Sequence, residues 1–323
     1  MTKFMAQKQN FLPYCVLSGK RSVGVEKTVE KRYNGDTRYL REFQERKAIR
    51  MKNRMKCCVA LLITLLLLIG AWIPVSASGY RRIPITYEGK TVMGGEALLI
   101  DSTTYVPFRA VCDALGEGSV GWDDKTKTAT FASDDLNISA TCYSLYIEAN
   151  GRYFYCENGV KNVDSRIYVP IRPMAKAFGV EVTWDPSYKV SLSGGEALKS
   201  ADAFYDETDL YWLSRIISAE SRGESLRGKI AVGNVVQNRM KDRYFPNTMK
   251  DVIFQSGQFT PVKNGHIYDT PTEESVIAAK LCLEGAVVTN DALYFCNPAI
   301  ATGTWMQRNR DYLMTIENHA FYA

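Results

Sequence analysis

The sequence predicts an α+β fold: an N-terminal repeat-built domain with a small antiparallel sheet plus helices, then a C-terminal α+β domain, both behind a basic leader. The first observation is an internal repeat, in which IDSTTYVPFRAVCDALGEGSVGWDDKTKTATF from Ile100 returns as VDSRIYVPIRPMAKAFGVEVTWDPSYKVSL from Val163. The second is a set of apolar residues at helical spacing beyond residue 205. The third is an uncharged stretch, residues 57–75, directly after a basic segment.

The leader has the pattern of an export signal. MKNRMK precedes CCVALLITLLLLIGAWIPV, and the small residues Val75 and Ala77 fit a signal-peptidase site. We therefore expect residues 51–77 to be a cleaved signal peptide, with a retained signal anchor as the alternative. Residues 1–50 are a doubtful N-terminal extension, because Met51 begins an ordinary signal-peptide start; a cytosolic basic tail is the competing interpretation.

The charge distribution argues against a nucleic-acid partner. The 323-residue chain has a formal net charge of +5, but residues 1–56 hold 15 Lys and Arg against 5 Asp and Glu. The remaining residues carry 25 basic and 30 acidic side chains, so the exported part is acidic. A basic groove for a phosphate backbone is therefore not expected, and the membrane is a partner only through an uncleaved leader.

Five cysteines fall in the exported part, an odd number that excludes a complete disulfide framework: Cys112, Cys142, Cys156, Cys282 and Cys296. Cys142 and Cys156 are close enough in sequence to pair across a hairpin, although buried free thiols are the expected state for most of the five. The chain has only two histidines and no CxxC motif, so we expect neither a metal site nor a cofactor.

Each copy of the repeat has a Tyr-Val-Pro step, a short helix and a Trp-Asp turn between two alternating strands. The helices place apolar residues at positions i, i+3, i+4 and i+7: Phe108, Val111, Cys112 and Leu115 in the first copy, and Ile171, Met174, Ala175 and Phe178 in the second. The strands alternate through Val120 and Trp122, then through Val180, Val182 and Trp184. We therefore expect each copy to form one helix lying on a small antiparallel sheet.

These residues resemble the copper amine oxidase N-terminal-like domain, a module of exported bacterial proteins, over residues 83–192. We expect no copper there, because this segment contains no histidine. Four tyrosines of the segment are candidates for a sugar-binding platform, with half-buried packing as the alternative: Tyr143, Tyr146, Tyr153 and Tyr155.

Residues 193–204 have the composition of a linker, and residues 205–323 form the second predicted domain. A helix is expected from Asp209, with Leu213, Ile217 and then Glu220 on one face. The stretch from Ser221 to Gly223 is expected to end this helix, with Gly223 supplying the permissive backbone of a C-cap, and a second helix starts near Ser225. A glutamate at the end of an apolar stripe is costly to bury, which marks Glu220 for a functional role.

The second domain resembles the SleB/CwlJ family of bacterial cell-wall and spore-cortex hydrolases from Leu213 to Tyr322. The motifs that carry the resemblance are LSRIISAESRGESLRGKIAVGNVVQNRM, VIFQSGQFTPV, ALYFCNP and HAFY, in this order. The resemblance implies an α+β fold akin to lysozyme and lytic transglycosylases. It also implies that Glu220, the first glutamate of AESRGE, is the catalytic residue.

The chemistry of glycoside cleavage agrees with a role for Glu220. A carboxyl group protonates the leaving oxygen at neutral pH only if burial raises its pKa. The alternative is a structural pair with Arg215 or Arg222. Glu224 is weighed both as a second carboxylate in the sugar site and as a cap of the next helix. In lytic transglycosylases one carboxyl group suffices, because the muramic acid 6-hydroxyl attacks its own anomeric carbon.

Further residues of the motifs are predicted to bind substrate, each with a packing or turn role as the alternative: Glu224, Asn238, Gln258, Phe259, Tyr294 and Asn297. His319 is expected to be a hydrogen-bonded structural residue, and His266 to lie on the surface. Glu317 and Asn318 stand where the family pattern often has glycine, so the backbone beside His319 is expected to differ.

These observations favour an exported peptidoglycan hydrolase that cleaves the bond between N-acetylmuramic acid and N-acetylglucosamine, as a lytic transglycosylase. The expected partners are peptidoglycan glycan strands and, optionally, an accessory cell-wall protein. One alternative is an N-acetylmuramoyl-L-alanine amidase, although two histidines in separate loops supply zinc ligands poorly. The other is a non-catalytic wall-binding protein.

Overall fold

The computed structural model describes residues 45–47, 50–51, 79–301, 303 and 305–323. The chain divides into two units, Met1–Ser78 and Gly79–Ala323. The predicted extension (residues 1–50) and the signal peptide or anchor (residues 51–77) fall outside the described ranges, except for short helical stretches at 45–47 and 50–51. Among the residues that are described, no helix combines the length and the hydropathy needed to cross a membrane.

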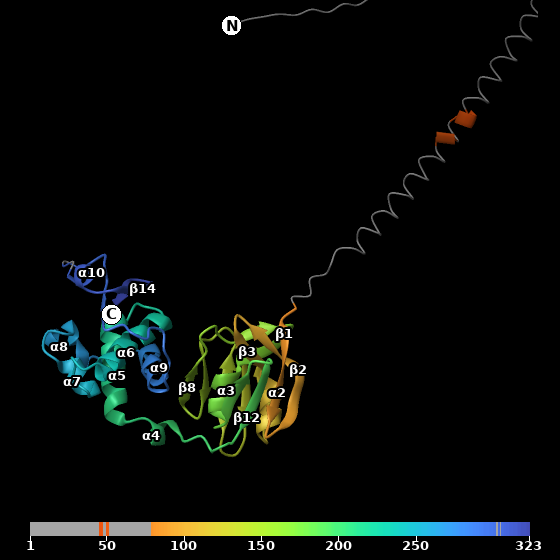
Figure 1. Cartoon of the computed structure of the whole chain (residues 1–323), viewed down its shortest axis with the longest axis horizontal. Helices are drawn as coiled ribbons and strands as arrows, with labels where there is room; N and C mark the ends of the chain where they lie inside the picture. The colour runs from red at the N-terminus through yellow and green to blue at the C-terminus, as the bar shows by residue number, and fades with distance from the viewer. Residues whose placement is uncertain (1–44, 48–49, 52–78, 302, 304) are drawn as a thin grey trace, which may run out of the picture. The chain divides into compact units, whose positions relative to one another are not determined.

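Residues 81–193, called the repeat domain below, form two sheets with two short helices (Figure 1). The seven-stranded sheet has the order β11-β12-β1-β2-β3-β10-β9 and the five-stranded sheet the order β4-β5-β6-β7-β8. The elements are β1 (Arg81–Tyr87), β2 (Lys90–Ile100), β3 (Thr103–Pro107), α2 (Phe108–Leu115), β4 (Ser119–Asp123), β5 (Thr128–Ala132), β6 (Asn137–Thr141), β7 (Tyr146–Ala149), β8 (Arg152–Tyr155), β9 (Lys161–Val163), β10 (Arg166–Pro170), α3 (Ile171–Ala177), β11 (Glu181–Asp185) and β12 (Lys189–Ser193).

The two copies of the repeat meet at their Tyr-Val-Pro strands, β3 and β10. These strands pair antiparallel with Val106 opposite Val169, and each tyrosine lies opposite the proline of the other copy. This register is symmetric, so a local two-fold axis relates the two copies. The same turn precedes each strand: Asp101 and Ser102 have φ of 47° and 62°, and Asp164 and Ser165 have 49° and 61°. Two consecutive left-handed residues are typical of the tightest hairpin turn.

The Trp-Asp hairpins of the two copies join different sheets. The first copy places β4 and β5 in the five-stranded sheet, whereas the second places β11 and β12 at the edge of the seven-stranded sheet. There β12 pairs parallel with β1, so this sheet is mixed rather than purely antiparallel. In each hairpin the aspartate after the tryptophan accepts a backbone N–H of the turn: Asp123 from Lys125 at 2.8 Å and Asp185 from Ser187 at 2.7 Å.

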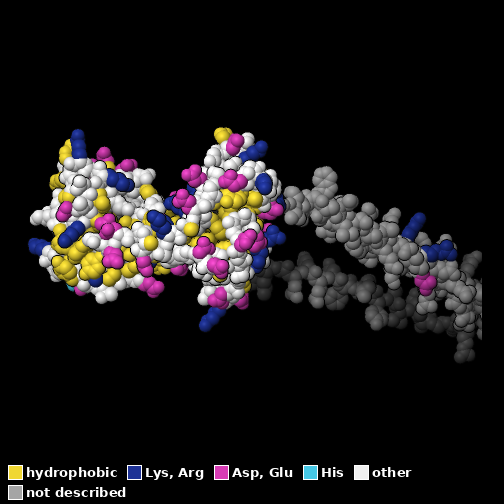
Figure 2. Space-filling model, turned by 90° about the horizontal axis from the view of Figure 1, so that it is seen from below, with side chains coloured by type: hydrophobic (Ala, Val, Ile, Leu, Met, Phe, Trp, Pro, Cys, Tyr) yellow, Lys and Arg dark blue, Asp and Glu magenta, His cyan; other side chains and the backbone are white. Residues whose placement is uncertain are grey.

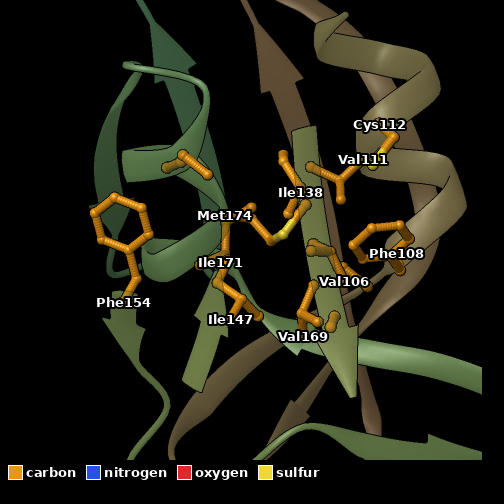
Figure 3. Packing of buried hydrophobic residues seen from close by; sticks show 14 of the residues in the cluster. Val106, Phe108, Val111, Cys112, Ile138, Ile147, Phe154, Val169, Ile171 and Met174 are labelled. Atoms are coloured by element: carbon orange, nitrogen blue, oxygen red, sulfur yellow. The ribbon is translucent and has the colours of Figure 1, made fainter. Parts of the chain in front are cut away.

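The predicted helices of the repeat are confirmed as α2 and α3, and their apolar faces form one core (Figure 3). Phe108 points from α2 toward Val106, while Val111 of α2 and Met174 of α3 point toward Ile138 (Figure 3). All five side chains are at most 2% exposed. Fully burying an aliphatic or aromatic side chain stabilises a fold by about 1.5–3 kcal/mol, so this shared core holds the two copies together.

The five cysteines of residues 79–323 are free thiols in the described structure. Cys142 and Cys156, the pair considered for a disulfide, are therefore not joined, and the buried Cys156 has its pKa raised by burial. Three of the four tyrosines proposed as a sugar platform pack against the apolar core of the C-terminal segment: Tyr146, Tyr153 and Tyr155. Tyr143 differs, with 77% of its surface exposed.

Residues 194–200 lack regular secondary structure, and mostly helical residues follow. Helices α5, α6 and α9 pack together in this segment, beside a small antiparallel sheet of order β13-β15-β14 (Figure 1). The elements are α4 (Ala201–Phe204), α5 (Glu207–Ser221), α6 (Leu226–Lys241), α7 (Met249–Phe254), α8 (Thr260–Asn264), the 3₁₀ helix η1 (His266–Tyr268), α9 (Glu273–Leu283), β13 (Tyr294–Cys296), α10 (Trp305–Asn309), β14 (Tyr312–Ile316) and β15 (His319–Tyr322).

Strand β8 lies against α9 within the unit Gly79–Ala323. Arg152 of β8 donates from Nε and Nη2 to the Glu284 carboxylate at 2.6 and 2.9 Å. The Tyr205 hydroxyl donates to the same carboxylate at 3.0 Å, and Lys280 donates to the Gly151 carbonyl at 3.0 Å. A bidentate arginine–carboxylate pair this buried is strong and directional, so it fixes how β8 and α9 lie against each other.

On the face seen in Figure 2, acidic and basic side chains are interspersed.

Candidate active site

Glu220 lies in the last turn of α5, on the face that enters the core. The helix begins at the predicted region, with the Asp206 side chain accepting the Asp209 N–H at 2.9 Å as its N-cap. Leu213 and Ile217 are fully buried, and Glu220 follows Ile217 by three residues on the same face. Because Glu220 follows this apolar stripe, its carboxyl group lies at a half-buried position at the end of the helix.

A buried lysine holds the turn after Glu220. The prediction that the stretch from Ser221 to Gly223 ends α5 is confirmed, because the helix ends at Ser221. The predicted C-cap role of Gly223 is wrong, because Arg222 is the C-cap and Gly223 is not among the positive-φ residues. Instead, Lys229 of α6 donates to the carbonyls of Arg222, at 3.4 Å, and of Glu224. The Lys229 side chain thus donates to carbonyl groups after the helix, whereas in a glycine C-cap backbone N–H groups of the turn donate to the last carbonyls of the helix.

The environment of Glu220 raises the pKa of its carboxyl group to about 7, and burial is the main cause. No hydrogen bond or salt bridge reaches this side chain from the residues that the structure describes. Arg215 and Arg222, the alternative partners, donate instead to backbone carbonyls: Arg215 to Tyr268 at 3.2 Å and Arg222 to Thr270 at 3.3 Å. The carboxyl group is therefore partly desolvated, and the described chain leaves it without a pairing partner.

Arg239 of α6 supplies a buried positive charge near Glu220. Its guanidinium carbon lies 5.0 Å from the ring centroids of Phe245 and Phe259 and 5.6 Å from that of Tyr294. Its Nε donates to the Leu293 carbonyl at 2.8 Å, and its buried Nη1 has no partner among the described residues. Burial lowers the pKa of Arg239 to about 10. The positive charge of Arg239 lowers the pKa of Glu220 and so offsets part of the increase that burial causes.

Two of the predicted substrate-binding residues lie on the Arg239 cluster, defined as Arg239, Phe245, Phe259 and Tyr294. Phe259 is 5% exposed, and Tyr294 is half-buried with its hydroxyl accepting a hydrogen bond from Arg310 at 3.0 Å. Gln258 precedes Phe259 and is half-buried, with its backbone N–H donating to Gln255 at 3.2 Å. The structure therefore gathers Phe259 and Tyr294 around the charge that acts on Glu220.

The other predicted substrate-binding residues make structural hydrogen bonds. The Glu224 carboxylate accepts from the backbone and side chain of Asn318 at 3.2 and 2.9 Å. The Asn238 amide donates to the carbonyls of Thr289 and Ala292 at 3.3 and 3.1 Å. The Asn297 side chain accepts the Ala299 N–H at 2.9 Å within its own turn. These contacts correspond to the packing or turn alternatives, and substrate binding by the three residues stays a prediction.

Two segments of the chain match known families. Residues 223–322 match the Cell Wall Hydrolase family, and residues 86–192 match the Copper amine oxidase N-terminal domain family. The chain carries a cell wall hydrolase domain. The matched residues of this hydrolase domain begin three residues after Glu220, so the prediction that Glu220 is catalytic rests on the physical environment described above and on the AESRGE motif.

Curated relatives of the hydrolase domain include the spore cortex-lytic enzyme of Bacillus cereus, 38% identical over 117 residues, which are 36% of this chain and 45% of the relative. The cell wall hydrolase CwlJ of Bacillus subtilis is 25% identical over 121 residues, which are 35% of this chain and 84% of the relative. The chain spans less than half the length of the spore cortex-lytic enzymes that it matches.

Among solved structures, the catalytic domain of the germination-specific lytic transglycosylase SleB from Bacillus anthracis is 37% identical. The match covers 37% of this chain and 97% of that chain, with a TM-score of 0.35.

The two histidines of the hydrolase domain differ in environment. His266 is exposed, as predicted, and its Nδ1 lies 2.9 Å from an Asp269 carboxylate oxygen. His319 is buried against Phe295, and its Nδ1 has no hydrogen-bond partner in the described chain, so the expected hydrogen bond at this nitrogen is absent. Burial lowers the pKa of His319 by more than the negative charges of Glu224 and Glu317 raise it. No cluster of three His, Cys, Asp or Glu side chains suited to a metal ion occurs within the described ranges.

Glu317 and Asn318 dock the C-terminal hairpin on the turn that follows Glu220. The Glu317 carboxylate accepts the Ser225 N–H at 2.6 Å, while Asn318 donates to Glu224. Burial raises the pKa of Glu224, but the hydrogen bonds from Asn318 outweigh it and the pKa is lowered overall. The residues that depart from the family pattern therefore bind the turn between α5 and α6, with Glu317 itself at a φ of 49°.

Sequence reasoning missed Arg239 and Lys229. Both are charged residues on α6 that are at most 4% exposed, and buried charges are rare unless they are paired. The available signal was their position: within a helix whose neighbouring residues are apolar, each falls on a face that is otherwise buried.

Proposed function

We propose that this chain is an exported peptidoglycan hydrolase that cleaves the glycosidic bond between N-acetylmuramic acid and N-acetylglucosamine, as a lytic transglycosylase. The observation that carries the proposal is Glu220: its carboxyl group has a pKa raised to about 7 by burial, with no described residue paired to it. The names of the relatives support spore cortex or cell wall peptidoglycan as the substrate class. Export through residues 51–77 is part of the same proposal.

In the proposed mechanism, Glu220 acts first as acid and then as base. With a pKa of about 7, a large fraction of the carboxyl groups is protonated at neutral pH and donates to the leaving glycosidic oxygen. The resulting carboxylate then accepts the proton of the muramic acid 6-hydroxyl as this oxygen attacks the anomeric carbon. One carboxyl group completes both transfers, and the product is a 1,6-anhydromuramic end.

Arg239 adjusts the acid–base balance of Glu220. Its positive charge favours the carboxylate that remains after proton donation, and so limits how far burial raises the pKa of Glu220. The rings of Phe259 and Tyr294 keep the guanidinium out of water, which strengthens its interaction with a nearby charge. Arg239 is therefore proposed as a positioning residue that acts through Glu220.

Product analysis tests the proposed reaction. We expect mass spectrometry of a peptidoglycan digest by the full chain to show anhydromuramic ends, because the substrate supplies the nucleophile. New reducing ends would instead indicate attack by water, and free peptide stems would indicate an amidase. Sacculi that stay insoluble with no new ends would contradict enzymatic cleavage altogether. Vegetative sacculi and spore cortex are digested in parallel to compare the two substrates.

The pH dependence of kcat/KM is expected to reveal how Arg239 affects the pKa of Glu220. Activity requires protonated Glu220, so the rate falls as pH rises through about 7. Arg239→Met removes the charge that lowers the pKa of Glu220, so the alkaline limb of kcat/KM moves to higher pH. Arg239→Lys keeps the charge and is expected to hold the limb closer to its original position.

The control for the pH experiment is Arg243→Met, which removes an exposed charge just beyond the same helix. It is expected to leave the limb in place. A folded Arg239→Met protein with an unmoved limb would show that this charge does not act on Glu220.

A further inference from the structure

The repeat domain carries two grooves that correspond to each other through the internal repeat. The Trp122 groove has a volume of about 480 Å³, and its lining includes Phe108, Arg109, Val120, Trp122, Ser165 and Arg166. The Trp184 groove has a volume of about 380 Å³, and its lining includes Ile171, Arg172, Val182, Trp184, Ser102 and Thr103. In both copies the groove lies where the helix begins and where the Trp-Asp hairpin starts.

Each groove is completed by the other copy. Arg109 and Trp122 come from the first copy, but the third wall of their groove is the turn at Ser165 from the second copy. The Trp184 groove has the reverse composition, with the turn at Ser102 supplied by the first copy. The symmetric pairing of β3 with β10 explains the exchange, because it carries the turn of each copy to the helix of the other.

Both grooves share an apolar floor, an indole ring, an arginine and carboxylates, the last from Glu96 and Asp113 in the Trp122 groove and from Glu157 in the Trp184 groove. Apolar residues form the floor, with Phe108 and Val120 in one groove and Ile171 and Val182 in the other. The indole rings stay accessible, with Trp122 48% and Trp184 38% exposed. An exposed arginine, Arg109 or Arg172, stands at the start of the adjoining helix. Because the two indole rings are exposed at equivalent positions of the repeat, each is available to stack on a ligand in its own groove.

This combination fits a carbohydrate that carries both acidic groups and hydrogen-bond donors, because each groove holds arginine as well as carboxylate side chains. The C–H face of a pyranose ring stacks on an exposed indole, while its hydroxyl and amide groups remain directed at polar residues. Arginine forms directional, bidentate bonds with carboxylates, such as the lactyl or peptide carboxylates of a peptidoglycan strand. A flat apolar partner protein fits less well, because an arginine stands in the lining of each groove.

We propose that the repeat domain holds two equivalent binding sites for peptidoglycan glycan strands, one in the Trp122 groove and one in the Trp184 groove. The choice of this ligand rests on the proposed function of the hydrolase domain. Because a two-fold axis relates the grooves, a directional strand that fits one groove runs in the opposite sense in the other. The two grooves therefore bind separate strand segments, and the domain is bivalent.

The experiment is a sedimentation assay with purified sacculi, using the full chain with Glu220→Gln so that the sacculi are not digested. Trp122→Ala and Trp184→Ala are each expected to weaken binding about 10-fold, because loss of either groove removes the gain from two linked sites. The double substitution is expected to weaken binding about 100-fold or more, because both grooves are then impaired. Tyr80→Ala is the matched control, since it removes another exposed aromatic ring that lies directly before this domain in the sequence and outside both grooves.

A second comparison separates sugar stacking from recognition of charge. Arg109→Met with Arg172→Met is expected to weaken binding to sacculi while leaving binding to chitin beads, which carry N-acetylglucosamine without carboxylates, nearly unchanged. Loss of the tryptophans is expected to weaken both. These arginines are exposed, so the arginine variant also tests the grooves if the tryptophan variants fail to fold.

The outcomes distinguish this proposal from the proposed function. Folded double tryptophan and double arginine variants that sediment like the Tyr80→Ala control would overturn the grooves as binding sites, whatever the enzymatic result. If the parent chain releases no muropeptides but the tryptophan variants lose binding, the grooves stand and the proposed cleavage fails.

Discussion

Glu220→Gln is expected to abolish the release of soluble muropeptides from sacculi while leaving the fold intact. An amide has nearly the shape of a carboxyl group, but it neither donates a proton to the leaving oxygen nor accepts one afterwards. Since a single group performs both transfers in the proposed mechanism, the loss is expected to reach at least the roughly 10²–10⁴-fold of a general acid–base catalyst. The measurement is the rate of muropeptide release, followed by mass spectrometry.

The pH dependence of stability checks that the Glu220→Gln protein is folded. Burial raises the folded-state pKa of Glu220 from 4.5 to about 7, so its contribution to stability is complete below pH 4.5 and is lost as pH rises through 7. Glutamine has no charge to bury. The variant is therefore expected to equal the parent near pH 4 and to exceed it at pH 8, by on the order of 2–3 kcal/mol in the free energy of unfolding.

Glu207→Gln is the matched control for the loss of activity. Glu207 is an exposed carboxylate in the first turn of the same helix, so its replacement removes one charge far along α5 from Glu220. We expect almost full activity and a change in stability of at most about 0.5 kcal/mol. Substantial lysis by a folded Glu220→Gln protein would contradict Glu220 as the acid and would direct attention to another carboxylate.

The parts of the fold that the sequence predicted are those fixed by local periodicity. Phe108, Val111 and Cys112 are spaced so that a helix places them on one face, and burying that face in the core stabilises the helix. The same logic predicted α5 and the half-buried position of Glu220. The exchange between the copies was not predictable from this pattern, because the pairing of β3 with β10 joins residues more than sixty positions apart.

The candidate site was predicted less completely than the fold. The motifs pointed to Phe259 and Tyr294, which lie on Arg239, but they did not reveal Arg239 as the charge that these rings surround. An arginine in a sequence is far more often exposed than buried, so residue type alone argued against it. For Glu224 the sequence left two roles open, a second carboxylate in the sugar site and a cap of the next helix. The structure adds a contact that the sequence did not reveal, because the Asn318 side chain donates to the Glu224 carboxylate.

Lys229→Met is expected to have the largest effect on stability among the changes considered for the hydrolase domain. The Lys229 side chain is 2% exposed, and its Nζ lies 2.8 Å from the Glu274 carboxylate of α9 while donating to the carbonyls of Arg222 and Glu224. Methionine fills nearly the same volume but leaves both carbonyls without this donor. We expect a loss of about 2–3 kcal/mol, since unpaired buried polar groups cost about 1–3 kcal/mol each and the removed desolvation of Lys229 offsets part of the sum.

The loss of Lys229 is also expected to lower activity, because the carbonyls that it binds follow Glu220 directly in the chain. A displacement of the catalytic group by about 1 Å reduces rates by about 100-fold, so a 10- to 100-fold fall in kcat is expected even at temperatures where the variant is folded. Thermal unfolding and muropeptide release measure the two effects. Lys241→Met is the matched control, since it removes an exposed lysine from the last turn of the same helix. A Lys229→Met protein as stable and as active as this control would show that the turn after Glu220 keeps its conformation without the buried lysine.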